Sequence, residues 1–436
     1  MKKLLTAALA FTIPAFGQTL FIHGADVYPV TGAVMKDASV LVQDGKIADI
    51  GAKLVAPKGA KILEAKGLRV YPGMIDSATE LGLSEIGAVR ETEDTGEIGE
   101  FVPQVRALTS VNPESEHFRV VRVNGITSVM TFPGSANAQL ISGQAALIHT
   151  DGWTWEQMEI KGAAGMLVPF PTTAGGRGRG GAPSDQEAPA PGAAPTGGFS
   201  QQLRNYQQQI KKLGDFLEEA RHYQKAKEVL AGKSGFKADL RYDAMIPVLE
   251  GREPLAVTAG RERFILDAIK FADEQKVKLV ILHPRELGAK VTAELKAKNI
   301  PVIFGRVLEL PEREDDAYDQ AFTLPLEAWK AGVKFAFGTF TENQFVRNLP
   351  YQAATAVAYG LPYEEALKAV TINPAEIWGV ADRIGSVEKG KIADLLITDG
   401  DPLEIQTKIV HLIIGGKDVD LKNHQTELYE KYLGRQ

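Results

Sequence analysis

The fold of this chain is decided by the stretch Tyr71–Leu81, which reads YPGMIDSATEL. We interpret its centre as a β-strand, in which residues two apart point to the same side. Ala78 and Glu80 would therefore share one face at the end of this strand. An alanine offers no atom to a metal ion, and a carboxylate binds one only as a hard, anionic ligand. The stretch therefore predicts a strand end with little capacity to hold a metal.

Outward from this strand, strand-like and helix-like segments alternate through the middle of the chain. Apolar residues at helical spacing, such as Phe264, Leu266, Ile269 and Phe271, predict a helix. Strand–helix repetition implies a parallel sheet, and closure into a (β/α)8 barrel is the common solution at this length. The predicted strands cover residues 125–130, 277–282, 301–304 and 332–337, and the predicted helices cover 263–275, 291–298, 352–359 and 363–370.

Both ends of the chain differ from this middle, because they consist of short β-rich pieces separated by turn signals. Asp44-Gly45 and Gly415-Gly416 are such turns. We predict an α/β protein in which both termini build one small composite β-sandwich domain beside a TIM-like (β/α)8 barrel. The composite domain takes residues 18–69 and 383–436, and the barrel takes residues 70–382.

A low-complexity segment interrupts the barrel. Residues 171–200 are almost wholly Pro, Gly, Ala, Ser and Thr. Such a composition cannot bury enough apolar surface to order itself, so we predict a disordered insertion. A polar helix over residues 201–231 follows, and we expect it to pack on the outside of the barrel.

The first residues of the chain resemble an export signal. An apolar run follows Lys2 and Lys3, and Ala15 and Gly17 supply the small residues that a signal peptidase recognises. We predict a cleaved signal peptide over residues 1–17 and a periplasmic or secreted protein. No cysteine is present for lipidation, so we expect no membrane anchor.

The overall composition excludes several classes of function. Of the 436 residues, 44% are hydrophobic and 24% are charged, which is an ordinary globular composition. The net charge of -6 provides no basic patch for nucleic acid. No apolar run after the N-terminus is long enough to span a bilayer. The absence of cysteine removes disulfides and thiolate chemistry.

Three separated motifs carry a resemblance to a known family. Pro72–Asp76 resembles the start of a P-G-x-I-D-x-H-x-H strand, Glu365–Ala375 resembles the helix after strand eight, and Gly385–Leu395 resembles a G-S-I-E-x-G-K-x-A-D-L return. Because they occur in the correct order, the chain is identified as a member of the amidohydrolase superfamily, and it is most similar to imidazolonepropionase-like amidohydrolases. The resemblance implies hydrolysis of carbon–nitrogen bonds other than peptide bonds, with water activated by one or two divalent metals.

The resemblance also implies where the metal ligands should lie. The strand-one histidines fall on Ala78 and Glu80, the strand-five histidine on Thr258, and the strand-eight aspartate on Phe340, so these positions depart from the pattern. Only His283, at the end of the sixth strand, matches it, and a strand-four ligand is not identified. The resemblance therefore leaves Glu80 and His283 as residual metal ligands. Thr258 and Phe340 would line the mouth of the barrel, which is the opening at the carboxyl ends of its strands.

Two residual ligands are fewer than a catalytic zinc needs, because such a zinc keeps about three protein ligands and a water. We therefore expect no bound cofactor, the alternative being one divalent metal such as zinc. His149 is a further candidate ligand, and its simpler interpretation is a hydrogen-bonded histidine at a strand end. A buried Glu80 would need a cation, a metal or donors. Arginines after strands five and six could offset its charge: Arg261, Arg263 and Arg285.

Several functional hypotheses remain open. The first is a catalytically impaired amidohydrolase that binds a small molecule or acts as a partner subunit, pairing with itself or with a related active amidohydrolase. The second is an active hydrolase of a cyclic amide, amide or dipeptide-like substrate, with a rebuilt single-metal site that adds Glu342 or a glutamate from the loop after strand one. The third is metal-free acid–base chemistry by Glu80 and His283. The charged loop over residues 82–100 is either a solvated surface loop or a lid.

Overall fold

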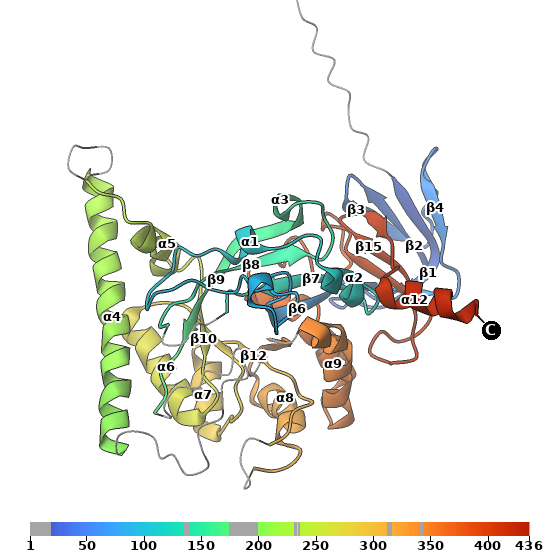
Figure 1. Cartoon of the computed structure of the whole chain (residues 1–436). Helices are drawn as coiled ribbons and strands as arrows, with labels where there is room; N and C mark the ends of the chain where they lie inside the picture. Colours follow the sequence, from blue (N-terminus) through green and yellow to red (C-terminus); the bar gives the residue numbers. More distant parts are fainter. Residues whose placement is uncertain are drawn as a thin grey trace, which may run out of the picture.

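The computed structural model describes residues 19–134, 139–173, 199–230, 233, 236–311, 316–340 and 343–435. Two eight-stranded sheets organise the chain: one curls into a barrel with helices around it, and the other lies at the side of the barrel (Figure 1). The predicted signal peptide (1–17) and most of the predicted insertion (171–200) lie outside the described residues. Within the described part, no helix has the length and apolar character needed to cross a membrane.

The barrel consists of eight strands that neighbour one another in sequence order. The ring closes where the chain after the last strand meets the first: the Phe340 amide donates to the Ala78 carbonyl over 2.6 Å, and the Glu80 amide donates to the Phe340 carbonyl over 3.2 Å. An apolar cluster with members from every strand fills the interior, so the barrel is a packed core. The strands are β6 (Met74–Thr79), β7 (Ile126–Thr131), β8 (Gly143–His149), β9 (Glu159–Pro169), β10 (Leu255–Thr258), β11 (Leu279–Leu282), β12 (Val302–Phe304) and β13 (Phe335–Phe337).

The structure corrects the expectation of a fully parallel barrel. Strand β8 runs antiparallel to both β7 and β9, whereas the other neighbouring strands are parallel. Parallel neighbours need a crossover connection, usually through a long helix. Only a short connection with α3 (Trp155–Met158) joins β8 to β9, so the chain turns back on itself. His149, at the end of β8, therefore lies at the bottom of the barrel, away from the carboxyl ends of the parallel strands.

Helices cover the outside of the barrel, and the four helices predicted in its second half are confirmed with small shifts of their ends. The long α4 (Phe199–Leu230) runs along one side, where it contacts α5 and α6 (Figure 1). It buries Leu213, Phe216 and Leu217, as expected for a helix on the barrel exterior. The remaining helices around the barrel are α1 (Ala107–Ser110), α2 (Glu116–Arg122), α5 (Leu240–Leu249), α6 (Glu262–Gln275), α7 (Ala289–Ala297), α8 (Gln320–Ala331), α9 (Leu349–Ala358), α10 (Tyr363–Ala369) and α11 (Ile372–Ile377), with 3-10 turns η1 (Arg90–Thr92) and η2 (Asn343–Asn348).

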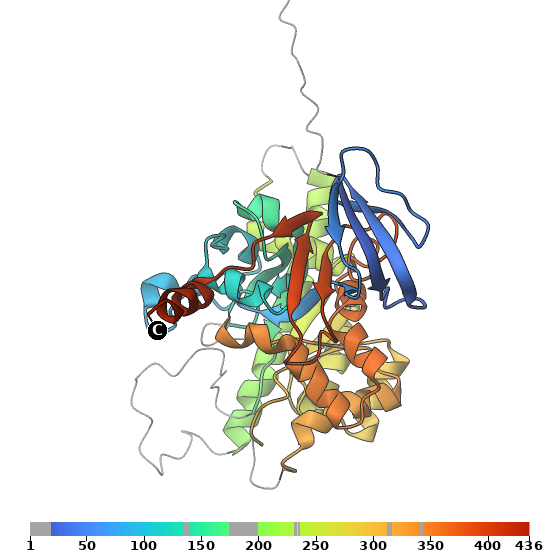
Figure 2. The same cartoon turned by 90° about the vertical axis from the view of Figure 1, so that its right-hand side faces the viewer.

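The second sheet joins the two ends of the chain, as predicted. In Figure 2 the blue N-terminal strands and the red C-terminal strands lie side by side, and β5 pairs antiparallel with β14. Ile22, Val40, Leu395 and Ile413 belong to its apolar core. The strand order is β16-β15-β14-β5-β1-β2-β3, with β4 on β1. Their bounds are β1 (Leu20–Val27), β2 (Met35–Gln43), β3 (Lys46–Gly51), β4 (Lys61–Glu64), β5 (Arg69–Pro72), β14 (Leu395–Thr398), β15 (Ile409–Ile414) and β16 (Lys417–Val419).

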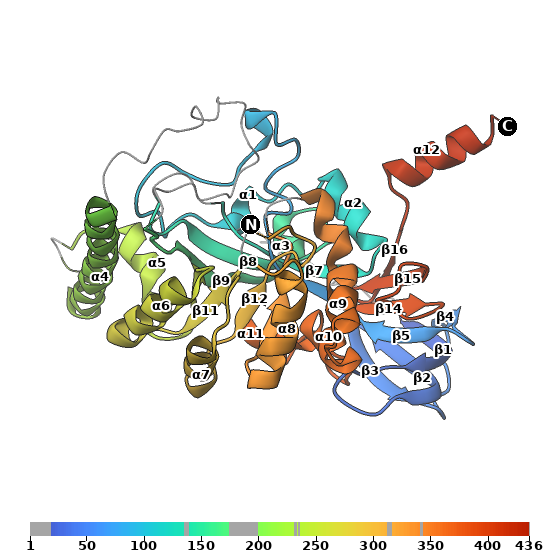
Figure 3. The same ribbon diagram turned by 90° about the horizontal axis from the view of Figure 1, so that it is seen from below.

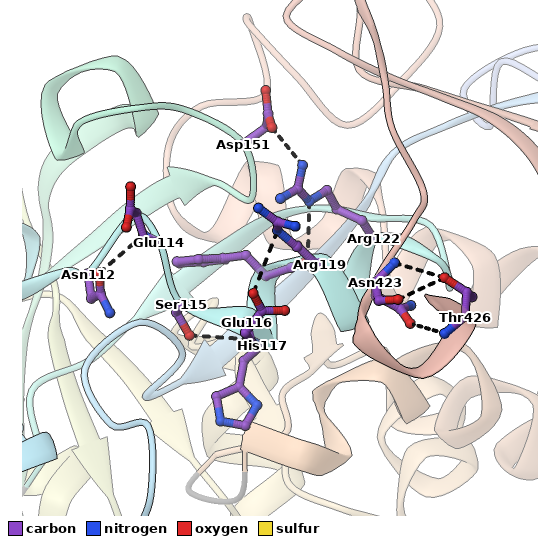
Figure 4. A network of polar contacts seen from close by, with 11 residues as sticks. Asn112, Glu114, Ser115, Glu116, His117, Arg119, Arg122, Asp151, Asn423 and Thr426 are labelled. Atoms are coloured by element: carbon purple, nitrogen blue, oxygen red, sulfur yellow. Dashed lines mark hydrogen bonds and ion pairs between the residues drawn. The ribbon is translucent and has the colours of Figure 1, made fainter. Parts of the chain in front are cut away.

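The last helix, α12 (His424–Leu433), projects from the body of the protein, and none of its side chains is buried (Figure 3). Its first turn is closed by a capping box, in which Asn423 and Thr426 exchange hydrogen bonds of 3.0 Å. Figure 4 shows this turn beside Arg122 of α2, which pairs with Asp151 over 2.7 Å. Asn423 is buried, so the start of α12 lies against the body of the protein while the rest of the helix extends outward.

Asp394, from the third sequence motif, joins the two sheets. Its backbone carbonyl accepts a hydrogen bond from the Gly73 amide over 2.8 Å, and its carboxylate accepts one from the Gly415 amide over 2.8 Å. The same carboxylate lies 3.0 Å from Nε2 of His149, and both side chains are largely buried. His149 is thus a hydrogen-bonded histidine at a strand end, and its candidacy as a replacement metal ligand was wrong because β8 runs toward the bottom of the barrel.

Gly73 leaves no room for a side chain at this junction. A Cβ atom built there would lie 2.0 Å from the hydroxyl oxygen of Thr127 and 2.7 Å from its Cβ. We expect Gly73→Ala to lower the free energy of unfolding by about 1–3 kcal/mol, because an overpacked core must shift. Urea denaturation measures the change. The matched control is Gly32→Ala, whose added Cβ meets nothing within 4 Å; equal losses in both variants would contradict the prediction.

Candidate functional site

The residues singled out in the sequence gather at one end of the barrel. Because β6, β10, β11 and β13 run parallel, their carboxyl ends form a common mouth. Glu80 follows β6, Thr258 ends β10, His283 follows β11 and Phe340 follows β13. Phe340 contacts both the chain at Glu80 and the ring of His283, whereas Thr258 is exposed and makes no side-chain hydrogen bond within the described residues.

Asp76 ties the first barrel strand to the turn after the last one, beneath the mouth. Its fully buried carboxylate accepts hydrogen bonds from the Ala78 amide (3.0 Å), the Thr339 amide (3.2 Å) and the Thr339 hydroxyl (2.5 Å). Burial raises the pKa of Asp76 to about 7, although these hydrogen bonds act in the opposite direction. Asp76 therefore has a structural role, because all three hydrogen bonds that its carboxylate accepts come from residues of the barrel.

Phe340 places a hydrocarbon ring where the superfamily pattern has an aspartate. Its backbone is in the left-handed region, with φ of 58°, and is held there by two hydrogen bonds with β6 and the residue after it. The phenyl ring stacks on the imidazole of His283 at a centroid distance of 5.0 Å and an interplanar angle of 29°. It also packs on the apolar cluster inside the barrel, which includes Ala78. The floor of the mouth is therefore apolar on this side.

Glu80 is partly buried and has no partner among the residues that the structure describes. Its carboxylate makes no hydrogen bond or ion pair with any residue in the described part of the chain. A Cβ atom on Gly134 would lie 3.2 Å from Oε1 of Glu80, which shows how closely the neighbouring loop covers this group. Burial, with a smaller effect from the Glu93 carboxylate, raises the pKa of Glu80 to about 8. Glu80 is therefore the mouth residue best suited to hold a proton near neutral pH.

The arginines expected to neutralise Glu80 have other partners. Arg285 donates to Glu309 over 3.2 Å, and Arg263 lies 4.0 Å from Asp267. For these two arginines the prediction was wrong: Arg263 lies on α6 and faces Asp267 one turn along the same helix, and Arg285 pairs with Glu309 in the loop after β12.

His283 stands on a tightly constrained turn. Its φ is 56°, and its amide donates to the Ile303 carbonyl over 2.8 Å. A Cβ atom on Gly305 would lie 2.4 Å from the imidazole ring, so only glycine leaves room for the ring at this place. Nε2 of His283 lies 3.6 Å from the carboxylate of Glu309. The imidazole is thus clamped between Phe340 and the turn that follows β12.

Glu309 is the principal mouth residue that the sequence did not indicate. Its carboxylate contacts Arg285 and also Arg306, whose Nε lies 3.3 Å from Oε1. Burial opposes ionisation, but His283 and the two arginines hold the pKa of Glu309 below its usual value. The sequence indicates only that Glu309 lies in the loop after a predicted strand. Many other residues have such a position, so it does not mark Glu309 as a residue of the mouth.

The charged loop after β6 is folded over the mouth. Ser84 and Glu93 form an antiparallel bridge within it, and the side chain of Asn343 donates to the Ser84 carbonyl over 2.7 Å. At its far end, the ring of Phe101 stacks on Phe216 of α4 at a centroid distance of 4.4 Å. The loop is thus anchored to η2 on one side and to α4 on the other, and it covers Glu80 as a folded element.

The residues at the mouth do not fit a catalytic zinc. Ala78 provides a methyl group, Phe340 provides a hydrocarbon ring, and the imidazole of His283 is stacked on that ring. Only Glu80 and His283 remain as donors from the superfamily positions, where about three protein ligands are needed. Among the described residues, no group of three or more His, Asp or Glu side chains could hold a metal ion. Glu342, a candidate additional ligand, lies outside the described residues.

The raised pKa of Glu80 predicts a pH-dependent cost to stability. The unfolded chain ionises this carboxyl near its ordinary value of 4.5, and the folded protein does so near 8. The folded state therefore retains a proton between these values, and its stability falls as the pH rises through that window. We expect Glu80→Gln to increase the free energy of unfolding by on the order of 2 kcal/mol above pH 8, with little change at pH 4.

Urea unfolding of the two proteins from pH 4 to pH 9 measures this difference. Glu91→Gln is the matched control, because Glu91 is an exposed glutamate on the same loop. A loss of stability in Glu80→Gln above pH 8 would instead reveal a bound cation or a specific donor at Glu80.

Comparisons with known proteins agree with this architecture. Residues 210–419 match the Amidohydrolase family. Amidohydrolase tasK of Hapsidospora irregularis is 25% identical over 440 residues, which cover 92% of this chain and 43% of that relative. The chain thus spans less than half the length of that relative. Imidazolonepropionase of Sphingopyxis alaskensis is 46% identical over 55 residues, covering 12% of this chain and 14% of that protein.

A solved structure extends the likeness to both sheets. The crystal structure of an amidohydrolase from Thermotoga maritima MSB8 is 28% identical and superimposes with a TM-score of 0.77, covering 92% of this chain and 99% of that protein. The family match, the relative and the solved structure that each align with 92% of this chain, and the ordered sequence motifs agree. The chain belongs to the amidohydrolase superfamily.

Proposed function

We propose that this protein has lost the metal-dependent hydrolysis of its superfamily and binds a small-molecule ligand at the barrel mouth. In this proposal it forms a homo-oligomer or is the partner subunit of a related active amidohydrolase. Its signal-like N-terminal sequence supports a place in the periplasm or outside the cell.

The contact between Phe340 and His283 carries the proposal. Metal-assisted hydrolysis needs a ligand set that leaves an open position for water and a group that takes the proton from that water. At the strand-eight position a phenyl ring lies against His283 at 5.0 Å, and it can supply neither function. An aromatic surface beside an imidazole and a few charged groups is instead typical of a small-molecule binding site.

A second function is favoured by the state of Glu80. Its partly buried carboxylate has no partner among the described residues, and a divalent cation would neutralise it. With Glu93 or Glu342 as an added ligand, a single-metal site would support hydrolysis of a cyclic amide, an amide or a dipeptide-like substrate. This alternative retains the superfamily's reaction type with a rebuilt site.

Metal content separates the two functions. We expect protein purified without chelator, offered excess zinc and then desalted, to retain less than about 0.1 equivalents by elemental analysis, since two donors bind zinc weakly. The matched variant is Glu80→Gln. Retention of a full equivalent by the wild type and its loss in Glu80→Gln would overturn the proposal in favour of the single-metal hydrolase.

Restoring the two histidines of the strand-one motif tests whether positions 258 and 340 are correctly assigned to the superfamily's metal-site positions. We expect the double variant Ala78→His with Glu80→His to remain inactive in zinc on a panel of cyclic amides and N-acyl amino acids, because Thr258 and Phe340 still supply no ligand or base. The comparison protein adds Thr258→His and Phe340→Asp. Turnover by the double variant alone would show that positions 258 and 340 are wrongly assigned.

A further inference from the structure

A single carboxylate at the mouth is surrounded by three nitrogen-bearing side chains. Oε2 of Glu309 lies 3.2 Å from Nη2 of Arg285 and 3.6 Å from Nε2 of His283, and Oε1 lies 3.3 Å from Nε of Arg306. These side chains are partly buried, with 18% of the Glu309 side chain exposed. Two guanidinium groups and an imidazole around one carboxylate form the arrangement that proteins use to recognise a carboxylate ligand.

The basic side of this arrangement is anchored independently of Glu309. The Arg285 amide donates to the Gly260 carbonyl over 2.7 Å, and the Arg285 carbonyl accepts a hydrogen bond from Gln320 of α8 over 2.9 Å. The guanidinium of Arg306 lies over the ring of Phe345 at 5.3 Å. These groups would keep their positions if Glu309 left.

The acidic side is held far less firmly. Glu309 lies between Leu308 and Leu310, whose side chains are 57% and 89% exposed. Within the described part of the chain, the amides of these three residues donate no hydrogen bond. The segment thus exposes its apolar side chains and buries its charged one, which is the reverse of the usual distribution. The polar contacts of this segment with His283, Arg285 and Arg306 are made by the Glu309 carboxylate.

A small cavity adjoins the same groups. It has a volume of about 50 Å³, and the polar side chains that line it belong to His283, Arg285, Arg306, Glu309, Asp316, Tyr318 and Gln320. Phe304 and Leu324 contribute an apolar wall. Departure of the Glu309 side chain would enlarge this space, which would then accept a carboxylate attached to a short aliphatic group.

We propose that His283, Arg285 and Arg306 form a binding site for small aliphatic carboxylates, and that Glu309 occupies it as an internal ligand until an external carboxylate displaces it. This inference rests on the proposed binding role of the mouth and names the class of ligand. Because Glu309 is tethered, it competes at a high effective concentration. Removal of its charge therefore increases the affinity for an external carboxylate.

Titration with sodium butyrate tests this competition, with sodium chloride holding the ionic strength constant. Binding is followed by saturation-transfer NMR on the full chain. We expect Glu309→Gln to bind butyrate at least about tenfold more tightly than the wild type. Addition of Arg285→Met to that variant should reverse the gain. Glu404→Gln, which removes the same charge from an exposed residue of the small domain, should match the wild type.

Equal butyrate affinity in the wild type and Glu309→Gln would overturn the inference, as would a gain that survives Arg285→Met. Preferential binding of sulfate over butyrate by Glu309→Gln would overturn the carboxylate class. If Glu309→Gln does not unfold cooperatively in urea, Glu309→Asp is the second variant. Its shorter side chain should give a butyrate affinity between those of the wild type and Glu309→Gln. A butyrate affinity equal to that of the wild type counts against the inference. The zinc-retention experiment tests the proposed function through Glu80, whereas the butyrate titration tests the carboxylate site through Glu309. The failure of one proposal can therefore be distinguished from the failure of the other.

Discussion

The buried carboxylate of Asp76 is the interaction on which the rest of the structure depends. It joins β6 to the turn after β13, 263 residues further along the chain, by accepting hydrogen bonds from Ala78 and Thr339. Each buried amide left without an acceptor would cost about 1–3 kcal/mol. Because these bonds close the barrel, they also set the backbone positions of Ala78 and Phe340. The same carboxylate that holds the fold together therefore determines the floor of the mouth.

The mouth has two unlike halves. On the side of β6 and β13, Ala78 and Phe340 provide hydrocarbon, and Glu80 has no partner within the described part of the chain. On the side of β11 and β12, the carboxylate of Glu309 is paired with His283 and two arginines. An apolar wall facing a few fixed polar groups is the composition of a ligand site. The stacked rings of Phe340 and His283 form the boundary between the halves.

Much of the fold could be predicted from the sequence, because helical and strand periodicity and the ordered motifs are local properties. The β-like stretch that became β8 was also visible, but its direction was not. Strand direction depends on the length and path of the connections, and the short link through α3 sends β8 antiparallel to its neighbours. This reversal moved His149 to Asp394 at the bottom of the barrel. The partner of Arg285 could not be predicted either. Arg285 follows β11 and Glu309 follows β12, and the sequence does not show that the loops after these two strands meet.

By itself, the sequence determined which chemical groups stand at the strand ends: a methyl at Ala78, a carboxylate at Glu80, an imidazole at His283 and a phenyl ring at Phe340. These identities already argued against a complete metal site. Only the tertiary structure decided which charges are paired. Glu80 and Glu309 are both glutamates in loops after barrel strands, yet burial raises the pKa of one and basic neighbours lower that of the other. The difference arises because contacts between distant loops exist only once the barrel has closed and the strand ends share one mouth.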